Sequence, residues 1–281
     1  MYPLMTVWAQ EYQNLNPHIR IEVSGGGAGK GIVDALSGIA DIGMVSRDLY
    51  PEEVARGAVY VSVAKDAVLA TINKDNPAYD KITSRGLTKN DFIKIFLSQE
   101  IKTWGELIGD AEIDEQIRVY TRADACGAAQ TWALYLGNYT QEDLTKSAHV
   151  AVLHDPDLAE AIRNDVSGIG YNNINFVYNL RTGKLIEGIS PVPIDLNEDG
   201  IISADEYFYD TREDLMNAIK TGVYPAPPVR DLHLLTKNEF TGETKKFIKW
   251  ILTDGQKYIP KNGYVMLSDT KIQKEFEKIR N

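Results

Sequence analysis

The chain has 281 residues, of which 43% are hydrophobic and 25% charged, and its net charge is −10. These values fit a folded globular protein long enough for two domains, and no run reaches the roughly 18 apolar residues of a membrane helix. The acidic balance and the lack of a basic run exclude nucleic acid as a favoured partner, while the single cysteine, Cys126, excludes an intrachain disulfide and a multi-cysteine zinc site.

In chain order, helical and strand patterns alternate, which predicts an α/β fold. Helices are expected over residues 6–16, 30–38, 51–57, 87–99, 125–137, 155–165, 211–222, 241–263 and 269–280. Strands are expected over 19–23, 40–46, 58–73, 117–122 and 168–178, with a further strand at the end of the proline-dense stretch 224–236. The long apolar run 58–73 is compatible with one strand or with two that are broken near Lys65.

Two apolar runs, 61–72 and 225–234, are the best candidates for connections between lobes. If both runs pass from one lobe to the other, residues 68–228 form one lobe, while residues 1–67 and 229–281 together form the other. Ligands of α/β proteins bind outside the carboxyl ends of strands and in clefts, so the loops after the strands are the places to search.

Three such loops lead from an expected strand into an expected helix: "SGGGAGKG" (24–31), "SRDLYPEE" (46–53) and "RADACGAAQ" (122–130). Each places backbone N–H groups at a helix N-terminus, where the helix dipole favours an anion. The glycine-rich loop is not a nucleotide loop, because Gly31 follows Lys30 where a P-loop has Ser or Thr. Taken alone, this loop is also compatible with a flexible turn.

The order of six segments is similar to that of the phosphate-binding protein (PstS-like) family. The segments are "YPLMTVWAQEY", "VSGGGAGKGI", "ADIGMVSRDL", "IKTWGEL", "TRADACGAAQTW" and "GIGYNNINF". Members are extracytoplasmic receptors of phosphate ABC transporters. The resemblance therefore implies a two-lobed type II periplasmic-binding-protein fold with two crossover strands and a central anion cleft.

The resemblance also implies the residues that surround the anion. They are Tyr2, Gly27, Ala28, Gly29, Ser46, Arg47, Arg122, Asp124, Cys126, Gly127 and Ala128. Ala28, Cys126 and Ala128 stand where the family has hydroxyl residues, which leaves N–H groups, Ser46 and two arginines as donors. A guanidinium can bind an oxyanion through two hydrogen bonds. Phosphate is the first expectation, and sulfate, molybdate and tungstate are alternatives.

Several of these residues have a second interpretation. Arg122 is also compatible with a structural ion pair, and Ser46 with a helix cap. Asp48 and Asp124 are the carboxylates available to accept a proton from phosphate, although Asp124 is also placed to orient Arg122. Cys126 near a helix N-terminus and an arginine has conditions that lower a thiol pKa, yet a thiolate would repel the anion. We interpret Cys126 as a neutral thiol or a packing residue.

The resulting hypothesis is a monomeric, non-enzymatic, extracytoplasmic receptor that delivers phosphate to an ABC transporter permease. We expect that its leader is absent from this sequence, because the chain opens inside an amphipathic pattern at Met1. The alternatives from other classes are a hydrolase or sensor that uses Cys126 and a calcium-stapled adhesion or scaffold module.

A second motif, "DLNEDGIISADE", matches a calcium loop of the EF-hand type at every specified position. Its expected ligands are Asp195, Asn197, Asp199, Ile201 through its carbonyl, Ser203 and Glu206. Two prolines before the loop prevent a helix there, while a helix is expected directly after it. We therefore predict a lone structural Ca²⁺ site, and an acidic turn without an ion is the alternative.

Overall fold

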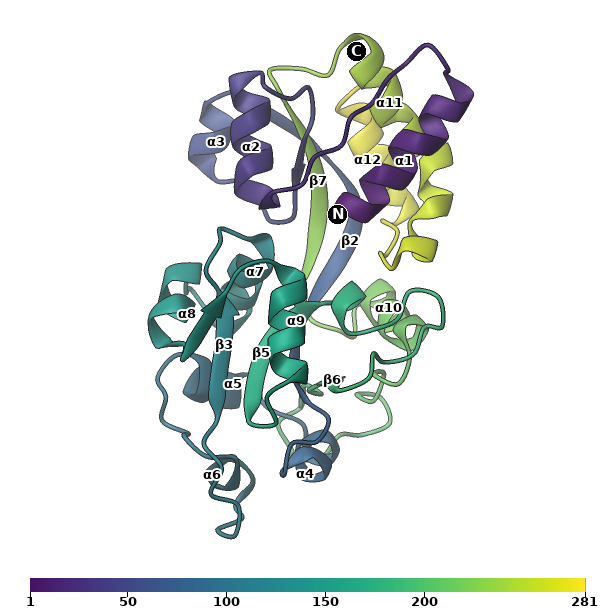
Figure 1. Ribbon diagram of the computed structural model, residues 1–281. Coiled ribbons are helices and arrows are strands. Elements are labelled where there is room, and N and C mark those ends of the chain that lie inside the picture. The colour runs from purple at the N-terminus through teal and green to yellow at the C-terminus, as the bar shows by residue number, and fades with distance from the viewer. Residues whose placement is uncertain (281) are drawn as a thin grey trace. The chain divides into compact units, whose positions relative to one another are not determined.

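The computed structural model describes residues 1–280, and the chain divides into two compact units. Unit 1 comprises Met1–Asp66 and Arg230–Asn281, and unit 2 comprises Ala67–Val229. Two strands, β2 (Ala58–Asn73) and β7 (Val229–Lys237), each contain residues of both units (Figure 1). Because β2 is one uninterrupted strand, the alternative of a break near Lys65 is wrong.

In unit 1, β7 lies between β1 (Gly43–Val45) and β2, and β1 and β7 are antiparallel. Alternate residues of β7 face opposite sides, as the twofold period of a strand requires. Leu232 and Leu234 belong to a core cluster with residues of α1 (Tyr2–Leu15), α11 (Gly242–Leu252) and β2. Leu235 belongs to a second cluster with residues of α2 (Gly27–Ser37). The short helix α3 (Pro51–Ala55) follows β1, and α12 (Asp269–Glu277) is the last helix of the chain.

The strand expected over residues 19–23 is wrong, because this segment is irregular. Its alternating apolar residues, Ile19, Ile21 and Val23, still pack against the first core cluster. The backbone N–H of Ile21, however, donates to the Gln13 side-chain oxygen at 2.7 Å. A side chain of α1 therefore takes a donor that a sheet partner would have needed.

In unit 2, β5 (Gly168–Asn173) is paired on both sides. It runs antiparallel to β2 and parallel to β3 (Arg118–Arg122), which pairs in turn with β4 (Val150–Val152). The strand β6 (Ile189–Pro191) pairs with β2. The core between helices and sheet contains five aromatic residues in mutual ring contact: Phe92, Phe96, Trp132, Tyr135 and Tyr171.

The helices of unit 2 largely follow the sequence pattern, and the predicted α/β fold is confirmed. They are α4 (Tyr79–Arg85), α5 (Lys89–Phe96), α6 (Trp104–Ile108), α7 (Gly127–Leu136), α8 (Gln141–Ser147), α9 (Asp155–Arg163) and α10 (Arg212–Thr221). The Thr88 side chain caps α5 as expected, accepting from the N–H of Asp91 at 3.1 Å. The helix expected directly after Glu206 is displaced, since α10 begins only at Arg212.

Two predicted elements are shorter than expected because they end in 3₁₀ turns. The strand expected over 168–178 ends at Asn173 and is followed by Ile174–Phe176. The helix expected over 241–263 ends at Leu252 and is followed by Asp254–Tyr258 and Pro260–Asn262.

A buried ion pair joins the two shared strands inside unit 1. The Arg230 guanidinium donates from Nη2 to Asp66 Oδ2 at 3.0 Å, and both side chains are less than 10% exposed. Such a pair fixes the register of β2 against β7 where the chain leaves the unit. Among the described helices, none has both the length and the apolar character that crossing a bilayer demands.

Candidate functional site

The glycine-rich segment forms the first turn of α2, which starts at Gly27 and not at Lys30. The N–H groups of a first helical turn have no acceptor within the helix, so Gly27, Ala28 and Gly29 present theirs at the end of α2. Ala28 is only 3% exposed, and its side chain belongs to the core cluster with Ile32. Position 28 can therefore offer a ligand its N–H group and nothing from its side chain.

Two other glycines hold α2 against β1. A Cβ built on Gly31 would lie 2.5 Å from the Met44 carbonyl oxygen, and one built on Gly43 would lie 2.3 Å from the Gly31 carbonyl oxygen. Distances below 3 Å are clashes with backbone, which cannot rotate away. Glycine at both positions thus allows the close packing that fixes the N-terminus of α2 relative to the loop after β1.

Tyr2 is the first residue of α1, whose Pro3 is tolerated because the first turn needs no donor there. A Cβ built on Gly25 would lie 3.8 Å from Tyr2 Cδ2, so the Tyr2 ring adjoins the glycine-rich segment. The side chain is 48% exposed. The structure therefore brings together the first two predicted contact segments of unit 1.

Ser46 follows β1 and is partly buried. The residue at the N-cap of α3 is Tyr50, so the interpretation of Ser46 as the cap of that helix is wrong. Its neighbour Arg47 binds Glu53 of α3, with Nη1 donating to Oε2 at 2.9 Å and Nη2 to Oε1 at 2.7 Å. Burial alone would lower the pKa of Arg47, but the Glu53 carboxylate raises it above its ordinary value.

The Arg47 guanidinium also lies over the Tyr50 ring, 4.1 Å from its centroid. Both Arg47 and Glu53 are less than 16% exposed at their side chains. Arg47 thus fastens the loop after β1 to α3, a structural role that the sequence did not indicate.

A histidine missed by the sequence analysis lies under this loop. His233 on β7 is 3% exposed, with Nδ1 at 3.2 Å from Ser62 Oγ and Nε2 at 3.6 Å from Asp48 Oδ1. The proximity of the His233 ring is the main reason why the pKa of Asp48 lies below its ordinary value. The Asp48 side chain is nevertheless 90% exposed, and only its Oδ1 lies near the histidine.

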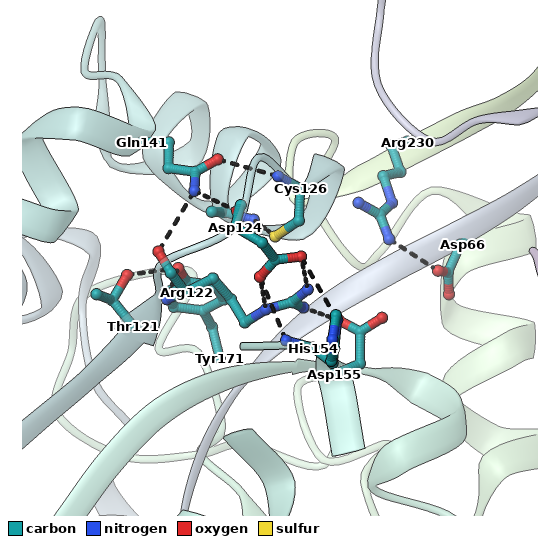
Figure 2. Close-up of polar contacts among 11 residues, drawn as sticks. Asp66, Thr121, Arg122, Asp124, Cys126, Gln141, His154, Asp155, Tyr171 and Arg230 are labelled. Carbon is teal, nitrogen blue, oxygen red and sulfur yellow. Dashed lines mark hydrogen bonds and ion pairs between the residues drawn. The ribbon is translucent and has the colours of Figure 1, made fainter. Parts of the chain in front are cut away.

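In unit 2, Arg122 ends β3 and is almost fully enclosed by acidic partners (Figure 2). Its Nε and Nη2 donate to the two oxygens of Asp124 at 2.8 and 2.6 Å, and its Nη1 donates to Asp155 Oδ1. The Arg122 side chain is 4% exposed, against 25% for Asp124 and 35% for Asp155. Although burial opposes it, these carboxylates raise the pKa of Arg122, which is a cation at any pH at which the protein is folded.

Backbone and side-chain contacts around Arg122 fix the loop that follows it. Gln141 at the start of α8 donates to the Asp124 carbonyl at 2.6 Å and accepts from the N–H of Cys126 at 3.1 Å. On β5, the Tyr171 hydroxyl accepts from the N–H of Arg122 at 3.2 Å. Asp155, Gln141 and Tyr171 come from distant segments, so no local pattern could have identified them.

Cys126 is the N-cap of α7, and its Sγ accepts from the N–H of Ala129 at 3.4 Å. Burial raises the pKa of the Cys126 thiol to about 11, although the Arg122 charge opposes this shift. The interpretation as a neutral thiol therefore agrees with the structure, and a nucleophilic thiolate does not. The N–H groups of Gly127 and Ala128 begin α7 and make no hydrogen bond with another described residue.

The calcium motif lies between β6 and α10. Three of its carboxylate and amide groups bind backbone N–H groups inside the loop: Asp195 Oδ2 accepts from Gly200 at 2.8 Å, Asn197 Oδ1 from Asp199 at 3.0 Å and Asp199 Oδ1 from Ile201 at 2.9 Å. Gly200 has φ +80°, which a residue with a side chain adopts with strain.

Glu206, the last expected ligand, binds the two ends of the same loop. Its Oε1 accepts from the N–H of Leu196 at 2.8 Å, and its Oε2 accepts from the Ser203 hydroxyl at 2.8 Å. Despite its burial, these bonds lower the pKa of Glu206. Within residues 1–280, no three His, Cys, Asp or Glu side chains are grouped as a metal site in this structure.

Comparisons with known proteins bear on both units. A family model described as a PBP superfamily domain matches residues 1–255. The chain is 25% identical to the phosphate-binding protein PstS of Bacillus subtilis (strain 168), over 98% of this chain and 80% of that protein. It is 23% identical to PstS of Pseudomonas aeruginosa (strain PAO1), over 94% of this chain and 79% of that protein.

Solved structures give the same fold. A substrate-binding protein of Clostridium perfringens, solved with bound phosphate, has a TM-score of 0.73 at 24% identity, covering 95% of this chain and 96% of that chain. An ABC-type phosphate transport receptor from Vibrio cholerae has a TM-score of 0.67 at 21% identity, covering 95% of this chain and 96% of that chain.

Proposed function

The chain belongs to the PBP superfamily, and on that basis we propose that it is a receptor that captures phosphate and delivers it to an ABC transporter. Its relatives from Bacillus and Pseudomonas are phosphate-binding proteins, which supports phosphate as the ligand. The receptor works outside the cytoplasm as a monomer, and its partner is the permease of the transporter. It carries out no covalent step.

The observation that carries this proposal is the position of Arg122 beside the N-terminus of α7. Three of the five N–H donors of its guanidinium bind Asp124 and Asp155, which holds the plane of the group in one orientation. The remaining donors and the N–H groups of Gly127 and Ala128 are suited to the oxygens of a tetrahedral anion. In unit 1, the N–H groups of Gly27, Ala28 and Gly29 at the start of α2 are suited to an anion for the same reason.

The charges around Arg122 favour phosphate over sulfate. One cation faces two carboxylates, so this part of the site is net negative before the ligand arrives. Two like charges 4 Å apart repel by about 4 kcal/mol at an effective dielectric constant of 20. Phosphate can replace this repulsive contact with a hydrogen bond because its protonated oxygen donates to a carboxylate, whereas sulfate at neutral pH has no proton to donate.

Asp155 is the better acceptor for this hydrogen bond. Asp124 uses both oxygens on Arg122, whereas Asp155 uses only Oδ1, and its Oδ2 has no hydrogen bond to any described residue. Neither the family resemblance nor the sequence pattern pointed to this residue.

Isothermal titration calorimetry with phosphate, sulfate, molybdate and tungstate tests the proposal. We expect saturable binding of phosphate and at least tenfold weaker binding of sulfate. Arg122→Met should abolish phosphate binding. Arg118→Met, on the same strand but 58% exposed at its side chain, should retain it. Silence towards all four anions would overturn the proposal, and tight binding of molybdate or tungstate alone would redirect it to another oxyanion.

The Cys126 hydrolase is less well supported, because a buried thiol with a pKa of about 11 is almost entirely protonated at neutral pH. The same holds for a sensor that depends on its thiolate.

A structural calcium ion forms part of the proposal as a second ligand. The loop of unit 2 would hold it through Asp195, Asn197, Asp199, the Ile201 carbonyl, Ser203 and Glu206, whose spacing matches a 12-residue calcium loop. Because Glu206 now binds the N–H groups of the loop, its carboxylate would have to turn towards the ion on binding.

A further inference from the structure

The calcium motif is fastened to a distant segment of unit 2, the junction between α4 and α5. The N–H of Ile202, the eighth loop residue, donates to the Ser84 carbonyl at 2.9 Å. Where the chain enters the loop, it makes two more backbone bonds to the same junction. The N–H of Asp195 donates to the Leu87 carbonyl at 3.1 Å, and the N–H of Leu87 donates to the Pro193 carbonyl at 2.9 Å.

Side-chain packing reinforces this attachment. Gly86 has φ +68°, and a Cβ built on it would lie 2.4 Å from Ile202 Cδ1, so the Ile202 side chain lies directly against the bare backbone. The eighth residue of such a loop usually pairs with a second loop. Here the junction Ser84–Leu87 pairs with Ile202 instead of a second loop, which explains how a single calcium loop can keep its conformation.

The loop carries charge that its protein partners do not balance. Residues 195–206 contain five carboxylates and no Lys or Arg. Asp195 is 3% exposed, and its Oδ1 is buried with no hydrogen-bond partner, while Oδ2 binds the N–H of Gly200. An ionised oxygen left unpaired in the interior is strongly unfavourable unless a cation or a donor reaches it. This atom occupies the first ligand position of the motif.

Resting on the proposed calcium site, we infer that the ion binds at Asp195 Oδ1 and acts as a latch that fixes the junction Ser84–Leu87. Without the ion, repulsion among the five carboxylates opposes the loop conformation that presents Ile202 to Ser84. With the ion bound, the loop and the junction open together only after the ion leaves. The ligand is a divalent cation with a preference for oxygen donors and flexible coordination, which is Ca²⁺ rather than Mg²⁺.

Calorimetry and hydrogen exchange on the full chain test this inference. Calorimetry should show one Ca²⁺ per chain. Exchange of the Leu87 and Ile202 amides should slow by up to about 100-fold at a free Ca²⁺ concentration of 100 times Kd, since opening would require release of the ion. The amide of Ile248 in unit 1 should not change.

Two matched variants sharpen the test. Asp195→Asn should abolish both effects, whereas Asp205→Asn, an exposed loop residue outside the ligand positions, should retain them. If Asp195→Asn does not fold, the comparison of the wild-type chain in Ca²⁺ and in chelator decides alone.

The possible failures are distinguishable. If Ca²⁺ does not bind, both the site and the latch are wrong, and phosphate binding measured separately is unaffected. If Ca²⁺ binds but the Leu87 and Ile202 amides exchange at unchanged rates, the site stands and the latch is wrong.

Discussion

Replacing Gly31 with Ala would test whether glycine in α2 serves packing or merely chain flexibility. In an unconstrained helix interior this change stabilises by about 1 kcal/mol, because Ala is the better helix former. Here the new Cβ would lie 2.5 Å from the Met44 carbonyl oxygen and 3.1 Å from the Met44 nitrogen. Overpacking against atoms that cannot rotate away costs about 3 kcal/mol, at the upper end of the usual range. We therefore expect a net loss of about 2 kcal/mol in the free energy of unfolding.

Urea unfolding followed by tryptophan fluorescence measures this difference, since the buried Trp8 of α1 reports on unit 1. Gly25→Ala is the matched control, because its Cβ would make an ordinary 3.8 Å contact with Tyr2. That change should be neutral or slightly stabilising. Gly31→Ala should also weaken phosphate binding, because the added Cβ separates α2 from β1. A stabilisation of about 1 kcal/mol with unchanged phosphate affinity would refute the packing argument.

Three further changes follow from the site. Cys126→Ser should retain phosphate binding in calorimetry, because a hydroxyl can replace the thiol as acceptor for the Ala129 N–H. In the wild-type chain, burial raises the pKa of the Cys126 thiol to about 11, so this thiol should react with iodoacetamide at neutral pH far more slowly than free cysteine does. Asp155→Asn should narrow the ratio of phosphate to sulfate affinity at least tenfold, and an unchanged ratio would exclude Asp155 as the proton acceptor. Burial alone would raise the pKa of Glu53, but the hydrogen bonds and charge of Arg47 lower it below its ordinary value of 4.5. The Arg47–Glu53 pair therefore stabilises the folded chain fully above pH 4.5, and this stabilisation is lost as the pH falls through the pKa of Glu53 in the folded state. Glu53→Gln should therefore cost about 1–3 kcal/mol at pH 7 and flatten the acid limb of the stability curve, measured by urea unfolding from pH 7 to 3.

Local patterns predicted elements where local forces decide them. The apolar period and the Thr88 cap located α5, and the small residues after β3 located the start of α7. The strand expected over 19–23 failed for the opposite reason. Its alternation correctly predicted which side chains pack inward, but Gln13 of α1 binds the backbone donor of Ile21. The periodicity of apolar residues indicates which side chains are buried, but it does not indicate which groups accept hydrogen bonds from the backbone N–H groups.

The site residues divide in the same way. Position 28 was identified through the family resemblance, yet its burial in the core was not visible in the sequence. Arg47 looked equivalent to Arg122, since each follows a strand. Only the structure shows that Arg47 is paired with one carboxylate on the next helix, Glu53, whereas Arg122 is paired with two, Asp124 and Asp155.

In an anion site built on helix N-termini, the amino-acid sequence indicates where the site lies more clearly than which anion it binds. Its donors are backbone N–H groups, so the sequence encodes the position of the site through small residues such as Gly127 and Ala128. The identity of the anion depends on acceptors instead, and the acceptor with a free oxygen, Asp155, lies 33 residues after Arg122. Loss of side-chain hydroxyls at positions 28, 126 and 128 therefore bears on affinity, while the distinction between phosphate and sulfate follows from a carboxylate that the fold brings to Arg122.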